Sequence, residues 1–308
     1  MAGGGARGGR TAEWRVTMRI SPTMLTTSGL VLLSALPLAA QNDATPPTPT
    51  AAVVRACDAA GGLAVFKRLG VLQLQIRREE VTQEGVVTDM TKTISFLAPG
   101  PTPGRTEDPQ SKVIAGDDGS GGWALVNGKA DARPATAYMV KRLLATELFP
   151  LLLPFSLTWD GVTVTSVTPA EVGGRAVWRL TVSLMPTFFH TPQISTTWKV
   201  DLDRRSFALL AAESPATDLG KGLTADGMRF SWREPLTVRS VRLSGYQRIV
   251  GLDEVGREKS HSRIDHVAYK VLPASEAARL FANPIPPEER PKPPGPQPPR
   301  PAGGNPGP

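Results

Sequence analysis

The stretch Val71-Leu-Gln-Leu-Gln-Ile-Arg77 decides the fold, because its side chains alternate strictly between apolar and polar. In an extended chain successive side chains point to opposite faces, so the leucines and the isoleucine share one face. Period-two alternation is typical of a strand with one buried face, which is common in antiparallel sheets. The stretch therefore predicts one strand of an antiparallel sheet that has an apolar face.

The second half of the chain repeats this pattern. Residues 178–184 and 194–200 carry tryptophan or aliphatic side chains at most alternate positions. Asn127-Gly128 predicts a two-residue hairpin turn, because both residues tolerate positive φ. Further strands are expected at residues 86–96, 162–167, 207–213, 228–232, 238–250 and 262–272. Helical spacing predicts helices at residues 51–68, 135–149 and 275–281.

These elements predict an α+β, mostly β fold. About ten strands form one large, curved antiparallel sheet, and the helices pack on one of its faces. Residues 100–120 and 214–227 are rich in Gly and other turn-forming residues, so both are expected to be loops. Residues 201–206, Asp-Leu-Asp-Arg-Arg-Ser, are interpreted as a solvated turn.

The N-terminus reads as an export signal. Residues 30–40 form an apolar run that is too short to span a bilayer but has the length of a signal-peptide core. Arg19 precedes the run and small residues end it, so residues 1–40 are expected to be a signal peptide cleaved near Ala40. An uncleaved membrane anchor is the alternative. Residues 1–17 are Gly- and Arg-rich and are interpreted as an over-extended reading of the gene.

Three further tracts follow the signal. Residues 41–50 are a Pro/Thr linker, residues 51–284 are the globular body, and residues 285–308, with 11 prolines, are a disordered Pro-rich tail. The tail is interpreted as a spacer, with contact to an envelope partner as the alternative. We expect an exported protein of the periplasm or cell envelope, with no membrane span after signal cleavage.

Charge and cysteine content exclude several classes of protein. The net charge is +7, and residues 1–40 hold four Arg and one Glu, so the rest of the chain carries +4. Nucleic-acid binding needs a concentrated basic face, and none is expected here. A single cysteine rules out a disulfide scaffold.

Candidate catalytic groups are scarce. The three histidines are His190, His261 and His266, and the last two are five residues apart, so they point to opposite faces of a straight strand. Cys57 has no histidine nearby in sequence to act as a base. We therefore expect no enzyme activity, no cofactor and no metal site. A hydrolase using His190 or His266 is the least favoured alternative.

The apolar face of the sheet is the candidate binding site. Alternate side chains would line a cavity between the sheet and the helices, with residues 135–155 as a movable lid. Burial of apolar surface at about 25 cal/mol per Å² would then favour an acyl chain or another apolar ligand. If the helices fill the hollow instead, the same residues are ordinary core. The predicted lining residues are Leu72, Leu74, Ile76, Leu144, Leu152, Phe155, Trp178, Leu180, Val182, Trp198 and Val200.

Short motifs distributed along the body carry a family resemblance. In order they are Ala59-Ala-Gly-Gly-Leu63, Gly122-Trp-Ala-Leu-Val-Asn-Gly128, Glu171-Val-Gly-Gly-Arg-Ala176, Val200-Asp-Leu-Asp-Arg204, Gly245-Tyr-Gln-Arg248, Ile264-Asp-His-Val267 and Leu280-Phe-Ala-Asn-Pro284. Together they resemble the periplasmic lipoprotein-carrier superfamily (Lol-like, outer-membrane lipoprotein-sorting), in its longer bacterial branch.

This resemblance implies a half-open barrel, whose curved antiparallel sheet is covered by helices on the concave face. In characterised members the cavity takes up the lipid chains of lipoproteins. The chain departs from the family in its length, in residues 214–227 and in its Pro-rich tail, and no functional residue of the family is carried over. Lipid or lipoprotein cargo is thus the expected ligand. The alternative is a structural or interaction protein with a filled core.

Overall fold

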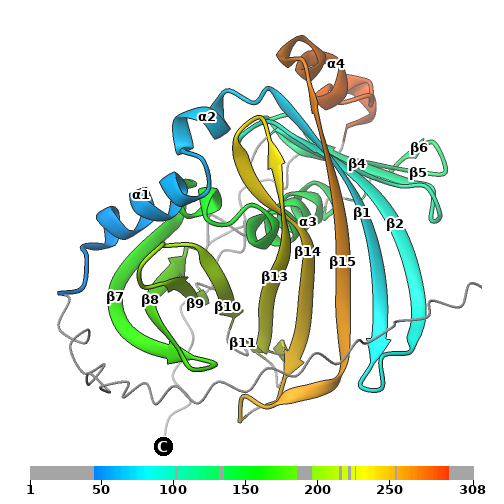
Figure 1. Ribbon diagram of the computed structural model, residues 1–308. Helices are drawn as coiled ribbons and strands as arrows, with labels where there is room; N and C mark the ends of the chain where they lie inside the picture. Colours follow the sequence, from blue (N-terminus) through cyan, green and yellow to red (C-terminus); the bar gives the residue numbers. More distant parts are fainter. Residues whose placement is uncertain are drawn as a thin grey trace, which may run out of the picture. The chain divides into compact units, whose positions relative to one another are not determined.

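The computed structural model describes residues 45–290, apart from 101–102, 132, 134, 186–195, 215–216, 221–222, 226 and 254. Thirteen strands form one antiparallel sheet in the order β6-β5-β4-β3-β2-β1-β15-β14-β13-β10-β9-β8-β7, and β11 and β12 form a separate hairpin (Figure 1). The strands are β1 (Val71–Thr82), β2 (Val87–Leu97), β3 (Gly104–Asp108), β4 (Val113–Asp117), β5 (Gly122–Val126), β6 (Lys129–Ala130), β7 (Val162–Val172), β8 (Arg175–Leu184), β9 (Thr196–Asp203), β10 (Leu209–Ser214), β11 (Thr217–Gly220), β12 (Leu223–Ala225), β13 (Gly227–Val238), β14 (Val241–Leu252) and β15 (Glu258–Leu272).

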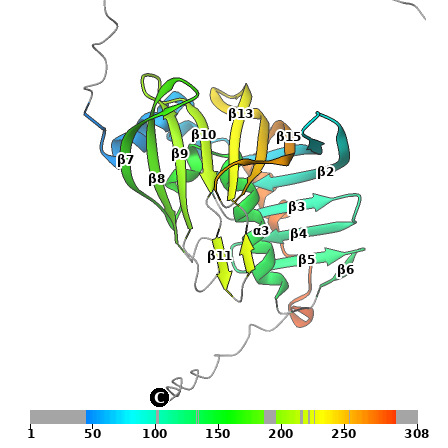
Figure 2. The ribbon, with the colours of Figure 1, turned by 90° about the horizontal axis from the view of Figure 1, so that it is seen from below.

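The sheet is curved and does not close, because its edge strands β6 and β7 are not paired with each other. Seen from below, the strands wrap around α3, so this helix lies against the concave face (Figure 2), and buried residues of α1 and α2 share its core. The helices are α1 (Pro49–Ala59), α2 (Leu63–Lys67), α3 (Thr136–Leu151) and α4 (Ala277–Phe281), with 3-10 turns η1 (Phe155–Thr158), η2 (Ala274–Glu276) and η3 (Pro287–Glu289). This confirms the predicted fold class, with more strands than expected.

The register of β1 confirms the alternation from which the fold was predicted. Leu72, Leu74 and Ile76 pair with Val271, Tyr269 and Val267 of β15, and these three β1 side chains are buried against the helices. The side chains between them point to the convex face, where Gln75 and Arg77 are exposed. The alternation along residues 72–77 therefore places the apolar side chains on the concave face and the polar side chains on the convex face.

Turn chemistry explains the hairpin at the end of β5. Asn127 and Gly128 both have positive φ, 52° and 76°, and they connect β5 to β6 as predicted.

The helix α1 begins where its sequence favours it. Pro49 occupies its first turn, and the Thr48 hydroxyl accepts a hydrogen bond from the Ala51 amide at 3.3 Å.

Two segments expected to be loops contain strands. Residues 104–108 and 113–117 form β3 and β4, and residues 217–225 contain the β11–β12 hairpin. The two sheet strands have only five residues each, and their sequences contain Gly and Asp. Their pairing with the neighbouring strands β2 and β5 outweighs these weak local preferences.

The closing helix α4 packs on the other face of the sheet. Its residues Leu280 and Phe281 contact Val71 and Phe96, which point away from α1 and α3. Beyond it, Ile285 is buried, and the Arg290 Nε donates a hydrogen bond to the Ile285 carbonyl at 2.9 Å. The predicted signal peptide, residues 41–44 of the predicted linker, His190 and residues 291–308 of the predicted tail lie outside the described residues. Within the described part, no helix is both long and apolar enough to cross a membrane.

Candidate functional site

The predicted lining residues all lie in one hydrophobic core. The eleven side chains are 0–5% exposed and belong to a single cluster that also contains buried residues of α1, α2 and α3. Leu72, Leu74, Ile76, Trp178, Leu180, Val182, Trp198 and Val200 come from the sheet, and Leu144, Leu152 and Phe155 come from α3 and the segment that follows it. The structure therefore brings the predicted set together between the sheet and the helices.

Aromatic side chains occupy the middle of this core. The Phe66 and Phe155 rings stack with centroids 4.3 Å apart and planes 1° from parallel. Trp198 meets Phe149 edge-on at 5.0 Å and stacks on Phe230 at 5.1 Å. These contacts tie the helical layer to strands β9 and β13.

The segment predicted as a lid is seated closely on the sheet. α3 buries Val140, Leu144 and Leu148 and packs mainly on β4 and β5. At Gly122 of β5, a Cβ atom would collide with the carbonyl of Ala137, so only glycine permits this approach. The same helix exposes Met139, which is 61% accessible. Whether this segment moves stays a prediction.

An apolar crevice opens where β13 separates from β10. These strands pair only between Ala211–Ser214 and Met228–Ser231, and residues 232–238 of β13 then continue beside β14 (Figure 1). The space beyond has a volume of about 320 Å³, and we call it the β10–β13 crevice. Its lining comprises Ala56, Ala59, Ala60, Leu153, Pro154, Ala208, Leu209, Trp232, Arg233, Pro235, Thr237, Arg242, Leu243 and Ser244.

The β10–β13 crevice runs from an exposed rim to a buried floor. At the rim, Ala208, Arg233 and Pro235 are exposed. At the floor, Ala56 of α1 and Leu243 of β14 are 1% and 2% exposed and belong to the central core. The crevice therefore leads from solvent to the same apolar interior that contains the predicted lining residues.

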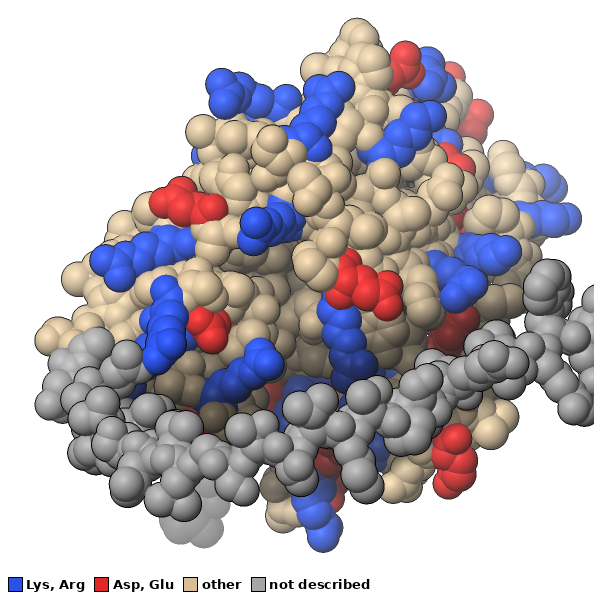
Figure 3. Space-filling model, viewed as in Figure 1, with Lys and Arg blue, Asp and Glu red and all other residues tan. Residues whose placement is uncertain are grey.

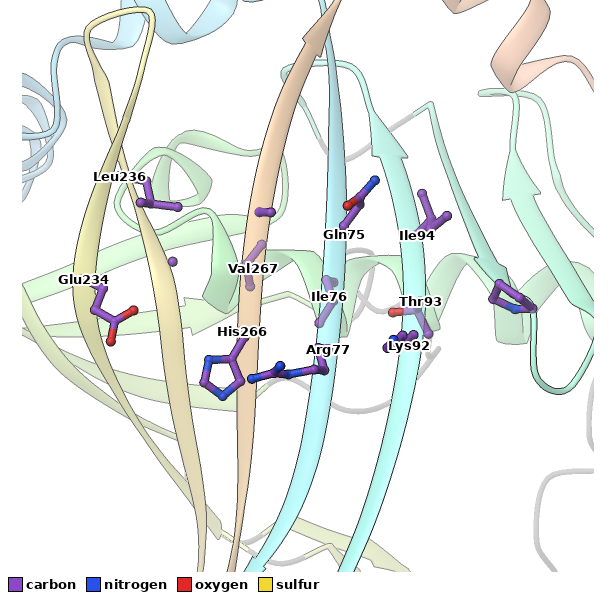
Figure 4. Close-up of a pocket in the computed structure, with 13 residues that line it drawn as sticks. Gln75, Ile76, Arg77, Lys92, Thr93, Ile94, Glu234, Leu236, His266 and Val267 are labelled. Carbon is purple, nitrogen blue, oxygen red and sulfur yellow. The ribbon is translucent and has the colours of Figure 1, made fainter. Parts of the chain in front are cut away.

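A larger groove of about 650 Å³ lies on the convex face, across β13, β14, β15, β1 and β2. Figure 4 shows Arg77 and His266 in the groove, between Glu234 and Leu236 on one side and Lys92 and Ile94 on the other, and Figure 3 shows basic and acidic side chains interspersed over this face. Glu79 pairs with the Arg77 Nε at 3.2 Å and with the His266 Nε2 at 3.4 Å. The groove is open and charged, so it is a poor site for an apolar ligand.

Among the described residues, the two candidate histidines lie on opposite faces of β15. His261 pairs with Thr82 and His266 with Arg77, and these two positions of β1 point to opposite faces, as expected. Asp201 differs from the prediction: it lies in β9, 2% exposed, and accepts hydrogen bonds from the Arg179 Nε and Nη2 at 2.8 and 2.9 Å. The sequence predicted a solvated turn for Asp201 because it does not show which residue of the neighbouring strand lies opposite this carboxylate.

Metal binding finds no support in the described chain. Among the residues that the structure describes, no three His, Cys, Asp or Glu side chains gather where they would hold a metal ion. Asp203 is the last residue of β9, and its carboxylate accepts hydrogen bonds from the amide and hydroxyl of Ser206 in the turn that follows, both at 2.8 Å.

We expect Cys57 to be unreactive in the folded protein. Its side chain is 2% exposed, and burial, with a smaller contribution from Asp58, raises the pKa of the Cys57 thiol to about 12. Because the thiolate is the reactive form, the neutral thiol should resist an aromatic disulfide reagent at pH 8 and react fully once urea unfolds the chain. Rapid labelling of the native protein would contradict this placement.

The described chain defines a class of protein: a curved, unclosed antiparallel sheet, helices against its concave face, and an apolar crevice leading between them. Three solved structures are similar to it. A LolA superfamily protein from Nitrosomonas europaea has a TM-score of 0.49 and 9% identity, over 77% of this chain and 99% of that one. A DUF1329 family protein from Desulfovibrio piger has a TM-score of 0.46 and 9% identity, over 75% and 98%.

The third structure is an outer membrane lipoprotein-sorting protein domain from Vibrio parahaemolyticus, with a TM-score of 0.43 and 10% identity, over 74% of this chain and 97% of that one. No family model and no curated protein matches the chain. The first and third structures carry names of the superfamily that the sequence resembles. At these TM-scores a function has to be argued from the chain's own residues.

Sequence reasoning missed the lining of the β10–β13 crevice. Its residues come from α1, the segment after α3, and strands β10, β13 and β14, and in the sequence most of them are unremarkable alanines, leucines and prolines. The separation of two strands is a property of their pairing and leaves no periodic signal. Only the Gly and Thr content of residues 214–227 indicated that the connection between β10 and β13 is irregular.

Proposed function

We propose that this chain is an exported, non-enzymatic protein of the periplasm or cell envelope that binds an acyl chain, carrying a lipid or a lipoprotein. The observation that supports this most directly is the β10–β13 crevice, an apolar opening of about 320 Å³ that reaches the central core. The predicted signal peptide and the sequence resemblance support the compartment and the class of cargo.

The chemistry of the crevice suits an apolar chain. Alanine, leucine and proline side chains form its floor and walls, and the charged groups Arg233 and Arg242 belong to its lining without an acidic residue among them. Its volume falls near the lower end of the range for small-molecule sites, about 300–1,000 Å³. Each methylene group transferred from water into such a site contributes about 0.8 kcal/mol.

The test blocks the rim without disturbing the core. Ala208 is exposed at the rim, so Ala208→Trp should fold normally and fill the entrance with an indole ring. We expect the dissociation constant for a dansyl-labelled fatty acid to rise about 10-fold or more, because excluding two methylenes already costs about 1.6 kcal/mol. Leu236→Trp is the matched control, since Leu236 lies on β13, which also borders the crevice, but lines the convex groove.

Two outcomes would decide against the proposal. Equal affinity in Ala208→Trp and the unaltered protein would place the ligand elsewhere. If the unaltered protein binds no probe, and mass spectrometry of gently purified protein finds no lipid, the interior is core only. The packing of all eleven predicted lining residues into one cluster favours the alternative in that case, a structural or interaction protein of the envelope.

A further inference from the structure

A row of polar side chains crosses the concave face beside the β10–β13 crevice. Trp232 of β13 pairs with Gln247 of β14, Gln247 pairs with Asp265 of β15, and Asp265 pairs with Arg78 of β1. Paired residues share a face, and adjacent strands are about 4.8 Å apart, so the four side chains are neighbours. We call these four residues the buried polar row.

The buried polar row faces the helices. Asp265 and Gln247 are each 1% exposed, and the Arg78 Nη1 donates a hydrogen bond to the Glu147 Oε1 of α3 at 2.8 Å. On one side the neighbouring positions of this face, Val267 and Ile76, belong to the central core. On the other side they are Ile249, which also belongs to the core, and its cross-strand partner Arg263, whose side chain is 32% exposed. The row therefore lies at the border of the apolar core.

Much of the hydrogen-bonding capacity of this row is unused. Within the described chain, thirteen buried side-chain atoms have no hydrogen-bond partner, and six of them belong to the row. They are both amide atoms of Gln247, the Trp232 Nε1, the Asp265 Oδ1, and the Arg78 Nε and Nη2. The Arg78 Nε and the Asp265 Oδ1 face each other as an ion pair at 3.5 Å, which leaves the two Gln247 atoms, the Trp232 Nε1 and the Arg78 Nη2 without any partner among the described residues. Buried polar groups in proteins are nearly always hydrogen-bonded, so such a cluster calls for a partner from outside the chain.

The charges around the row are balanced. Arg78 lies between Glu147 at 2.8 Å and Asp265 at 3.5 Å, and Arg263 contacts Asp265 at 3.1 Å. Burial acts to lower the pKa of Arg78, but the charges and hydrogen bonds of Glu147 and Asp265 together outweigh it and raise that pKa. Burial raises the pKa of Asp265, against the opposing effect of Arg263 and Arg78. The two cations, Arg78 and Arg263, lie next to two carboxyl groups, those of Glu147 and Asp265. The charges balance, so the row has no net attraction for a charged ligand.

The unused atoms include both donors and acceptors. The Trp232 Nε1, the Gln247 Nε2 and the Arg78 Nη2 donate, whereas the Gln247 Oε1 accepts. A carboxylate only accepts, so it would leave the Gln247 Oε1 without a donor. An amide or hydroxyl group donates and accepts, and it can satisfy both kinds.

Trp232 connects the row to the crevice, because it lines the crevice and its indole N–H is one of the unpartnered donors. From this continuity we infer that the buried polar row binds the neutral, hydrogen-bonding head of an amphiphile, an amide or a hydroxyl group, whose alkyl chain lies in the β10–β13 crevice. The inference rests on the proposed function and adds the class of head group to it.

The experiment compares two neutral ligands of the same chain length on the full-length protein. A primary fatty amide donates and accepts, whereas the fatty-acid methyl ester only accepts. Displacement of the dansyl-labelled fatty acid should require an amide concentration about 10-fold lower than the ester concentration, the ratio expected for one or two additional hydrogen bonds.

Substitutions in the row identify where this preference arises. Gln247→Leu should reduce the preference to about 2-fold or less while ester binding is retained, since the alkyl chain still has its crevice. Gln75→Leu is the matched control on the exposed face of the same sheet, and it should keep the full preference. Trp232→Phe keeps an aromatic ring but removes the indole N–H, and it provides a second variant should Gln247→Leu not fold.

The outcomes separate the two claims. If amide and ester displace the probe equally in the unaltered protein, or if both row variants keep the preference, the inference is overturned while acyl binding stands. If neither ligand nor the probe binds, the proposed function itself is overturned, and the inference with it.

Discussion

Phe155→Ala is expected to lower the free energy of unfolding by about 3–5 kcal/mol, the cost typical of truncating a buried phenylalanine. Phe155 is 0% exposed, and its ring stacks on Phe66 at 4.3 Å. Removing it deletes apolar contacts and leaves a cavity that the stacked partner cannot fill. Urea unfolding followed by tryptophan fluorescence measures the change.

This experiment also distinguishes a packed core from an open cavity. Leu236→Ala is the comparison, because Leu236 is 39% exposed and its truncation should cost less than about 1 kcal/mol. If Phe155→Ala were as mild as this control, the space around the ring would already be open, and Phe155 would line a cavity as the sequence pattern predicted. A large loss instead assigns it to the core beside the crevice.

Arg78→Met is expected to cost about 3–5 kcal/mol, because it removes the only cation that contacts both Glu147 and Asp265 among the described side chains. The Arg78 side chain is 16% exposed and Asp265 is 1% exposed, so water cannot replace the lost partner. Methionine retains most of the aliphatic length of arginine, so the loss reports mainly on the charge. The free energy of unfolding at pH 7 is the quantity to measure.

Arg77→Met is the matched control, since Arg77 is the next residue along β1 and points to the opposite face. Its side chain is 47% exposed, and it pairs with Glu79 at 3.2 Å. Exposed ion pairs contribute about 0–1 kcal/mol, so this variant should be nearly as stable as the unaltered protein. Similar losses for the two variants would show that the concave face around Arg78 is open to water.

The contrast between Arg77 and Arg78 marks the limit of sequence reasoning here. Alternation along β1 predicted correctly that Leu72, Leu74 and Ile76 share a buried face, because strand geometry alone fixes that relation. The same alternation places Arg78 on the buried face, but nothing local reveals Glu147 or Asp265. These partners come from α3 and β15, which are 69 and 187 positions away.

Asp201 illustrates the same limit. Its sequence neighbours predicted a turn, which holds for residues 204–206 but not for Asp201, because Asp201 lies within β9 and pairs with Arg179 on the adjacent strand β8. The short strands β3 and β4 were missed for a related reason. Both strands are only five residues long and contain Gly and Asp beside strand formers such as Val113 and Ile114, and pairing with β2 and β5 determines their conformation.

The amino-acid sequence by itself determined the mostly β class, the apolar face of the sheet, the turn at Asn127-Gly128 and the position of α3, because these depend on periodicity and local backbone preference. The single helix expected at residues 51–68 is instead two helices, α1 and α2, because Gly61 and Gly62, both with positive φ, interrupt it. Only the tertiary structure decided that β13 parts from β10 to open an apolar crevice, and that Trp232, Gln247, Asp265 and Arg78 align beside it. The physical reason is that strand pairing joins residues far apart in the chain, and the register of that pairing depends on the packing of the whole sheet.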